Sequence, residues 1–279
     1  MPDIFAVFHE YPFLRRALLA GVCLALCAAL LGVNLVLKRY SMIGDGLSHT
    51  AFGALAIASA LNIAPLWFAI PVTVLAAILL LRFGNSRKLL GDSSVALLSV
   101  SALAAGVLVL SLKGANTDIN SYLFGSLLAL TREDTIFCAA LAVIIVTLYL
   151  LFYHRLFAVS FDETFAKSAG LPTGLTAALL AALTAAVVVL GMRLMGALLI
   201  SALILFPPLS AMRAFGSYRS VTIGAASFAI LAFLAGLGAS WGLGTPVGAS
   251  IVMSNLALFF VCVIVDKLRG MRRTNHDHQ

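Results

Sequence analysis

Residues 17–37 read ALLAGVCLALCAALLGVNLVL, and after Lys38 and Arg39 a second run, YSMIGDGLSHTAFGALAIASALN, fills residues 40–62. The first run carries no charged residue, and a helix needs roughly 20 apolar residues to cross a bilayer. Backbone groups in hydrocarbon must bond within their own segment, so runs of this kind form helices. The stretch therefore predicts two consecutive membrane helices.

The same pattern continues along the chain. Of its 279 residues, 62% are hydrophobic and only 10% are charged, whereas soluble domains average about 25% charged residues. No run alternates with period two, as the strands of a membrane barrel do. We therefore expect an all-α polytopic membrane protein, one transmembrane domain over residues 1–279 with eight to nine transmembrane helices. The further apolar runs are 65–81, 93–112, 134–153, 172–192, 194–212, 220–241 and 245–265.

The basic residues predict the orientation. If the C-terminus is cytoplasmic and the chain crosses nine times, 13 of the Lys and Arg residues fall inside and 5 outside. This is the positive-inside bias of membrane proteins, so the net charge of +7 is not taken as a sign of nucleic-acid binding. The pair Arg15-Arg16 is the exception, and the count falls to eight if the first run does not cross.

One inner connection, residues 154–171, is too polar to span and too long for a tight turn. Within it, Asp162 and Glu163 precede Lys167 and Gly170, the order in which charges and a glycine cap favour the two ends of a helix. A short helix at the cytoplasmic surface is predicted. It is either a membrane anchor or a docking site for a partner.

The pair Asp45 and His49 stands out at the head of the second run. Spacing of four residues puts both on one helix face, at a depth where an ionisable side chain is costly unless it faces a partner or a cavity. Three interpretations remain open: a buried hydrogen bond that joins helices, half of a divalent metal site, or a proton relay. Cys23 and Cys27, also one turn apart, are interpreted as small buried hydrophobic residues rather than as a soft metal site.

Four stretches, in order, resemble the zinc/manganese/iron class of bacterial ABC importer permeases. RRALLAGVCLALCAALLGVNLVLKRYSMIGDGLSHTAFG resembles the start of that family and contains its Asp and His as Asp45 and His49. SFDETFAKSAGLP resembles its ATPase-contact loop, MGALLISALILFPPLSAM its Gly-to-Pro helix, and GTPVGASIVM its last Pro-x-Gly-Ala element. One departure is Gly244, where the family often has an aspartate.

The resemblance implies a type II ABC importer permease-like bundle that moves a divalent transition metal into the cell across the cytoplasmic membrane. Zinc is the first candidate, with manganese or iron as alternatives, and no cofactor is expected to be permanently bound. Asp45 and His49 would be the metal ligands. The residues implied in ATPase contact are Asp162, Glu163, Phe165, Lys167 and Gly170.

The implied partners are a second, identical permease copy, a cytoplasmic ATPase and an extracellular or periplasmic metal-binding protein. The sequence has no G-x-x-x-x-G-K-[ST] phosphate loop, so we expect a transport subunit and not an enzyme. Two rivals remain. One is a proton-coupled secondary transporter using Asp45 and His49, which broken helices would favour; Pro207-Pro208 either interrupts its helix or merely ends it. The other is a membrane assembly subunit that transports nothing.

Overall fold

The computed structural model describes residues 12–40, 42–83, 91–113 and 130–276. Every regular element in these ranges is an α-helix. The helices are α2 (Pro12–Leu37), α3 (Ile43–Ala60), α4 (Pro65–Phe83), α5 (Gly91–Leu112), α7 (Arg132–Leu151), α8 (Tyr153–Phe161), α9 (Glu163–Ser168), α10 (Thr173–Met195), α11 (Ala197–Ala214), α12 (Tyr218–Leu243) and α13 (Val247–His276).

The long helices coincide, in order, with the apolar runs of the sequence. Among the described residues, seven helices are long and apolar enough to cross a membrane, and α2 is one of them. The other two long helices are α4, whose apolar part Pro65–Leu80 is shorter, and α3, whose first turns carry Asp45 and His49. The predicted all-helical membrane bundle is confirmed, and the seven full-length spans found in the described ranges are one fewer than the lower end of the expected eight to nine.

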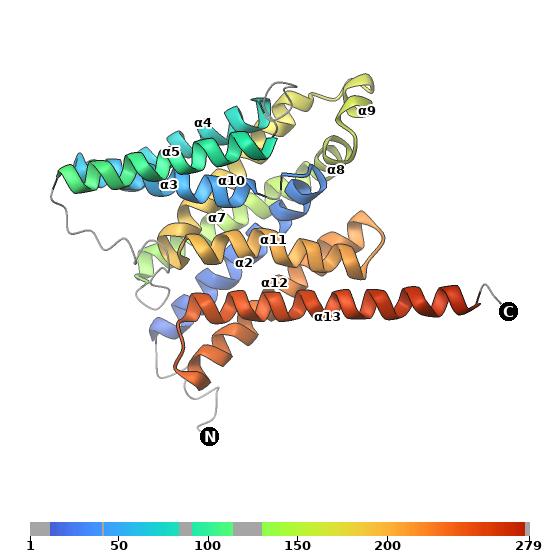
Figure 1. Cartoon of the computed structure of the whole chain (residues 1–279). Helices are drawn as coiled ribbons and strands as arrows, with labels where there is room; N and C mark the ends of the chain where they lie inside the picture. The colour runs from blue at the N-terminus through green and yellow to red at the C-terminus, as the bar shows by residue number, and fades with distance from the viewer. Residues whose placement is uncertain (1–11, 41, 84–90, 114–129, 277–279) are drawn as a thin grey trace.

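Two helices form the centre of the bundle. The span-length parts of α2 and α10 are 72% and 67% buried, against 22% for α5 and 17% for α13. Helix α10 contacts both α3 and α4, while α2 contacts α7, α11 and α12. Figure 1 shows α3, α4 and α5 side by side as one group, with α11, α12 and α13 forming another.

Ion pairs show which helix ends meet. Arg193, at the end of α10, lies 3.8 Å from Asp134 at the start of α7. Arg213, at the end of α11, lies 3.7 Å from Asp266 in the second half of α13. Helices α7 and α10 thus run in opposite directions, whereas α11 and α13 run in the same direction. Which side of the bundle faces the cytoplasm stays a prediction from the basic residues, some of which lie outside the described ranges.

The two adjacent prolines do not break their helix. Pro207 and Pro208 lie inside α11, which continues to Ala214, so the broken helix considered from the sequence is absent here. A proline at 208 has no N–H to bond the carbonyl of Ile204. That oxygen instead faces Gly32 of α2, at the place where a Cβ would stand. Glycine at position 32 therefore permits α2 and α11 to approach closely.

Candidate functional site

The Asp45/His49 pair occupies the first two turns of α3. This helix begins at Ile43, three residues after the start near Tyr40 that the sequence suggested. The Asp45 Oδ1 atom lies 3.7 Å from His49 Nε2, as expected for spacing i, i+4 on one face. That distance is too long for a hydrogen bond. The pair is a loose juxtaposition on one helix and does not itself join two helices.

Both side chains retain unused binding capacity. The Asp45 side chain is 56% exposed and that of His49 is 24% exposed. His49 Nδ1 is buried and has no hydrogen-bond partner in the described part of the chain. Within the same ranges no group of three or more His, Cys, Asp or Glu could hold a metal ion, and the four cysteines are free. Because protein sites for Zn²⁺ supply three or four ligands, the pair alone does not complete such a site.

Contacts with α11 place the pair within the length of the bundle. Ser48 Oγ lies 3.2 Å from Ser201 Oγ, and Gly44 packs against the side chain of Ile204. Ser201 and Ile204 belong to the first half of α11, which starts at the opposite end of the bundle from α9. Helix α3 therefore begins beside the middle of a neighbouring helix. His49 lies about 9 Å further along than the first residue of α3.

A glycine seam holds α3 against α5. A Cβ at Gly46 would collide with Val95, and one at Gly53 with the carbonyl of Ala102. A Cβ at Gly106 would lie 2.8 Å from the Cα of Gly53. The two helices thus meet nearly backbone to backbone. Gly46, next to Asp45, is needed for this packing whatever role the aspartate has.

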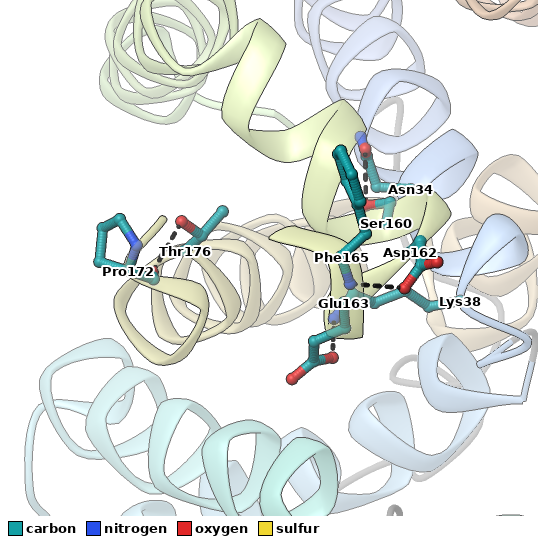
Figure 2. Close-up of polar contacts among 8 residues, drawn as sticks. All are labelled: Asn34, Lys38, Ser160, Asp162, Glu163, Phe165, Pro172 and Thr176. Atoms are coloured by element: carbon teal, nitrogen blue, oxygen red, sulfur yellow. Dashed lines mark hydrogen bonds and ion pairs between the residues drawn. The ribbon is translucent and has the colours of Figure 1, made fainter. Parts of the chain in front are cut away.

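The polar segment after α7 contains two helices where the sequence predicted one. The predicted helix is confirmed as α9, and α8 precedes it. Asp162 separates them in an extended conformation, and its carboxylate accepts a hydrogen bond of 2.9 Å from the Phe165 backbone N–H (Figure 2). Gly170, with φ of +77°, ends the turn after α9. The aspartate and the glycine thus fix the two ends of α9.

Glu163 and Lys38 tie α9 to the end of α2. Lys38 Nζ lies 2.9 Å from Glu163 Oε2, and the lysine side chain is only 8% exposed (Figure 2). Burial, and then the Glu163 carboxylate, raise the pKa of Tyr40. The turn that leads from α2 into α3 therefore lies against α9. Only this tight turn separates Lys38 from the helix that carries Asp45.

The remaining members of the predicted contact set face outward. Phe165 is 69% exposed, and Lys167 in the last turn of α9 is also exposed. Phe161, at the end of α8, is 75% exposed, whereas Ala166 is fully buried. Of the sequence-predicted contact residues, Phe165 and Lys167 are thus available to a partner, while Asp162 and Glu163 make bonds within the chain.

A buried polar cluster around Asn34 was not predicted. The Asn34 amide donates to Tyr149 Oη at 3.3 Å, and its Oδ1 accepts from Tyr218 Oη at 3.0 Å and Ser160 Oγ at 3.1 Å. The two tyrosine hydroxyls are 3.0 Å apart. The cluster joins α2, α7, α8 and α12. Its only sequence signal is the amide of Asn34 in an otherwise apolar run, a type of residue that bonds membrane helices together.

The departure from the family pattern at Gly244 has a backbone explanation. Gly244 caps α12 in the left-handed conformation, with φ of 65° and ψ of 28°. Glycine adopts this conformation at low cost, as it does at the ends of many helices. A Cβ at this position would meet nothing within 4 Å. The residue therefore serves the turn between α12 and α13.

Comparison with known proteins relates this architecture to membrane transporters. Residues 10–266 match the model of the ABC 3 transport family. The chain is 27% identical over 257 residues to the manganese import system permease protein ScaB of Streptococcus parasanguinis, with 92% of each chain covered. It is 29% identical over 248 residues to the high-affinity zinc uptake system membrane protein ZnuB of Buchnera aphidicola, with 88% of this chain and 94% of that protein covered.

A solved structure shares the same bundle. PsaBC from Streptococcus pneumoniae, in complex with Fab, superposes with a TM-score of 0.83 at 27% identity, covering 92% of this chain and 93% of that one. The family match spans every helix from α2 to the membrane-spanning part of α13. Together with the apolar helices, these similarities show that the chain is a multi-pass membrane protein and belongs to the ABC 3 transport family.

Proposed function

We propose that this chain is the permease subunit of an ABC importer that moves a divalent transition metal ion into the cell, with Asp45 and His49 as transient ligands. The observation that carries the proposal is an imidazole with an unpartnered nitrogen, 3.7 Å from a half-exposed carboxylate, on a helix that starts within the bundle. The proton-coupled secondary transporter finds no support, because the matching family is one of ABC transporters.

A second identical copy would complete the metal site. The described residues of one chain supply two ligands and no third, and two copies would supply two carboxylates and two imidazoles. Four such ligands suit a tetrahedral divalent ion. Asp45 is half-exposed, so a second copy could reach it. Affinity should be modest, because a site on a transport path must release its ion.

We infer that zinc is the preferred cargo. Imidazole nitrogen suits Zn²⁺ well, whereas sites for Mn²⁺ rely more on oxygen ligands. Fe²⁺ is also compatible with a mixed set of imidazoles and carboxylates. The names of the relatives do not decide, since one is a manganese and another a zinc system. Selectivity would also depend on the extracellular metal-binding protein that delivers the ion.

A separate cytoplasmic ATPase would dock on α9 through Phe165 and Lys167. Support comes from their exposure and from a neighbouring apolar groove of about 350 Å³, formed by α8 and the turn between α11 and α12. Insertion of one helical turn into a groove is a common recognition mode. Asp162, Glu163 and Gly170 would act indirectly, because they fix the shape of α9 and bind it to α2.

The same contacts suggest how force reaches the metal ligands. A shift of α9 would pull on Lys38 through the 2.9 Å ion pair. Lys38 is joined to α3 by a tight turn, so Asp45 and His49 would move with it. Ser160 and Asn34 would hold α8 to α2 during this movement. Metal release would then follow ATP-driven displacement of α9.

Reconstitution in liposomes with the ATPase and the metal-binding protein tests the proposal. We expect ATP-dependent uptake, faster for Zn²⁺ than for Mn²⁺ or Fe²⁺. Ser59→Ala, near the far end of α3, serves as a control that leaves the ligand pair intact. Uptake driven by a proton gradient without ATP would contradict an importer of this class. ATP-dependent uptake with Mn²⁺ preferred would contradict only the choice of zinc.

A further inference from the structure

A groove of about 620 Å³ lies between α7, α8 and α12, away from Asp45 and from α9. Its mouth is formed by Tyr153, His154 and Arg219, which stand where α8 and α12 begin. The rest of its lining is mostly apolar, with Ile223 and Ile230 of α12 among the apolar side chains and Thr222 and Ser227 as the polar ones. The groove is thus basic at one end and mostly apolar elsewhere.

Arg219 has no carboxylate partner in the ranges that the structure describes. Lys38, Arg193 and Arg213 each pair with an acidic residue of another helix, whereas Arg219 shares the lack of such a partner among the described residues with Arg155, Lys167 and Lys267. Arg219 is exposed and stands in the first turn of α12, where the helix dipole also favours a bound anion. The basic mouth of the groove is therefore not neutralised from within the described chain.

The hydroxyl of Tyr153 supplies an independent sign of a missing ligand. This oxygen is buried and has no hydrogen-bond partner among the described residues. A buried hydroxyl without a partner costs about 1–3 kcal/mol. The ring of Tyr153 lines the groove and packs on Tyr218 with centroids 5.1 Å apart, so the hydroxyl lies just beneath the wall of the groove. Because the oxygen has almost no accessible surface, an acceptor that enters the mouth reaches it only with a small movement of the Tyr153 ring.

The groove, measured from its basic mouth to its apolar end, is about as long as one leaflet of a bilayer is thick. Ile223 and Ile230 lie seven positions apart on one face of α12, and Leu150 of α7 lines the same groove. With a rise of about 1.5 Å per residue, the distance along α12 from Arg219 to Ile230 is about 16 Å. Half of a hydrocarbon core of about 30 Å is about 15 Å.

We propose that this groove binds one acidic phospholipid. Its phosphate lies between Arg219 and His154 and accepts a hydrogen bond from the Tyr153 hydroxyl, and one acyl chain follows Ile223 to Ile230. A lipid is favoured over free phosphate because most of the groove is apolar and lies along a spanning helix. Tyr149, a member of the Asn34 cluster, also lines the groove, so the lipid supports the joint between α2 and α8.

The test is native mass spectrometry of the full chain, purified from membranes in mild detergent and then exposed to phosphatidylglycerol or phosphatidylcholine. We expect one phosphatidylglycerol to remain bound per chain and phosphatidylcholine to be lost. Arg219→Ala and Tyr153→Phe should each weaken retention, Arg219→Ala by about tenfold, as loss of a charged hydrogen bond implies. Arg155→Ala is the matched control, because this exposed cation stacks on Phe152 and does not line the groove.

Several outcomes would overturn the proposal. One is that Arg219→Ala and the unaltered chain retain phosphatidylglycerol equally. Another is that phosphatidylglycerol and phosphatidylcholine are retained equally. A third is that the chain forms a dimer that covers the groove and retains no lipid. Displacement by inorganic phosphate at millimolar concentration would show an anion site without a lipid chain, which also contradicts it. Melting of each variant in phosphatidylcholine nanodiscs separates weak folding from weak binding, since an unchanged melting temperature assigns the loss to the groove.

Discussion

The Asn34 cluster and the Asp45/His49 pair differ in how completely their polar atoms are bonded. Around Asn34, four side chains satisfy one another at 3.0–3.3 Å. At Asp45 and His49 the closest approach is 3.7 Å, and an imidazole nitrogen is left without a partner. A polar network with all partners present stiffens the structure. The incomplete pair at membrane depth is the basis on which a bound metal ion is proposed there.

The contrast matters because the two sites belong to one connected path. The Asn34 cluster and the Lys38–Glu163 pair fix α8 and α9 to the end of α2. The proposed ligands Asp45 and His49 follow on α3. In the proposed mechanism, the fully bonded Asn34 cluster transmits a displacement, and the Asp45/His49 pair, which makes no hydrogen bond to another helix, responds to it. Four experiments would sharpen or break this distinction.

The largest effect on transport is expected at Asp45 and His49. The double variant Asp45→Ala, His49→Ala should reduce ATP-dependent metal uptake to background, because it removes both proposed ligands. Folding should be preserved, since the pair makes no hydrogen bond that joins α3 to another helix. Uptake in liposomes and size-exclusion chromatography measure the two properties, with Ser59→Ala as control. Normal uptake by the double variant would remove the basis of the metal site.

Phe165→Ala tests the proposed docking of the ATPase on α9. A truncated aromatic anchor commonly costs about 2 kcal/mol, or roughly 30-fold in affinity. We expect loss of ATPase co-purification while metal binding at Asp45 and His49 persists. Phe260→Ala, which removes another exposed ring, on α13, is the matched control. If Phe165→Ala retains the ATPase and full uptake, α9 is only a surface anchor.

Asn34→Leu removes the amide that the other members of the Asn34 cluster bond. It leaves Tyr149, Tyr218 and Ser160 without their shared partner, at a cost of about 1–3 kcal/mol. The melting temperature should fall by several degrees, and metal binding should be unchanged. Tyr218→Phe, which removes one hydroxyl, should cause a smaller fall. A melting temperature equal to that of the unaltered chain would show that the cluster contributes no stability.

The smallest change in stability is expected for the ion pair. The Glu163 side chain is 45% exposed, so Glu163→Gln should lower stability by about 1 kcal/mol or less. Its effect should appear instead as fewer metal ions moved per ATP hydrolysed. The exchanged pair Lys38→Glu with Glu163→Lys should restore that ratio. An unchanged ratio in Glu163→Gln would exclude Lys38 from the path of force.

Much of the fold could be predicted because membrane helices are encoded locally. Each apolar run became a helix, and Asp162 and Gly170 marked the ends of α9 through side-chain and backbone preferences that act over a few residues. Helix α8 was missed because its sequence mixes polar and apolar residues without a clear start. Pro207 and Pro208 suggested a break, yet tight contact with Gly32 accommodates the carbonyl that Pro208 leaves unbonded.

The site was predictable only where it is local. The proximity of Asp45 to His49 follows from helical spacing. The partners of Asn34 lie 115 to 184 positions away in the sequence, and the periodicity of the sequence does not predict such contacts. The ion pair between Lys38 and Glu163, 125 positions apart, could not be predicted from the sequence for the same reason. The placement of the start of α3 beside the middle of α11 likewise depends on packing over the whole bundle.

The glycine seam between α3 and α5 separates positions of α5 that tolerate substitution from positions that do not. Leu97 and Leu108 of α5 are 74% and 60% exposed, so substitutions there alter only what the helix presents to its surroundings. At Gly53 a single methyl group would collide with the backbone of Ala102. A lineage can therefore adapt the outside of α5 to a membrane of different thickness while Asp45 and His49 keep their places.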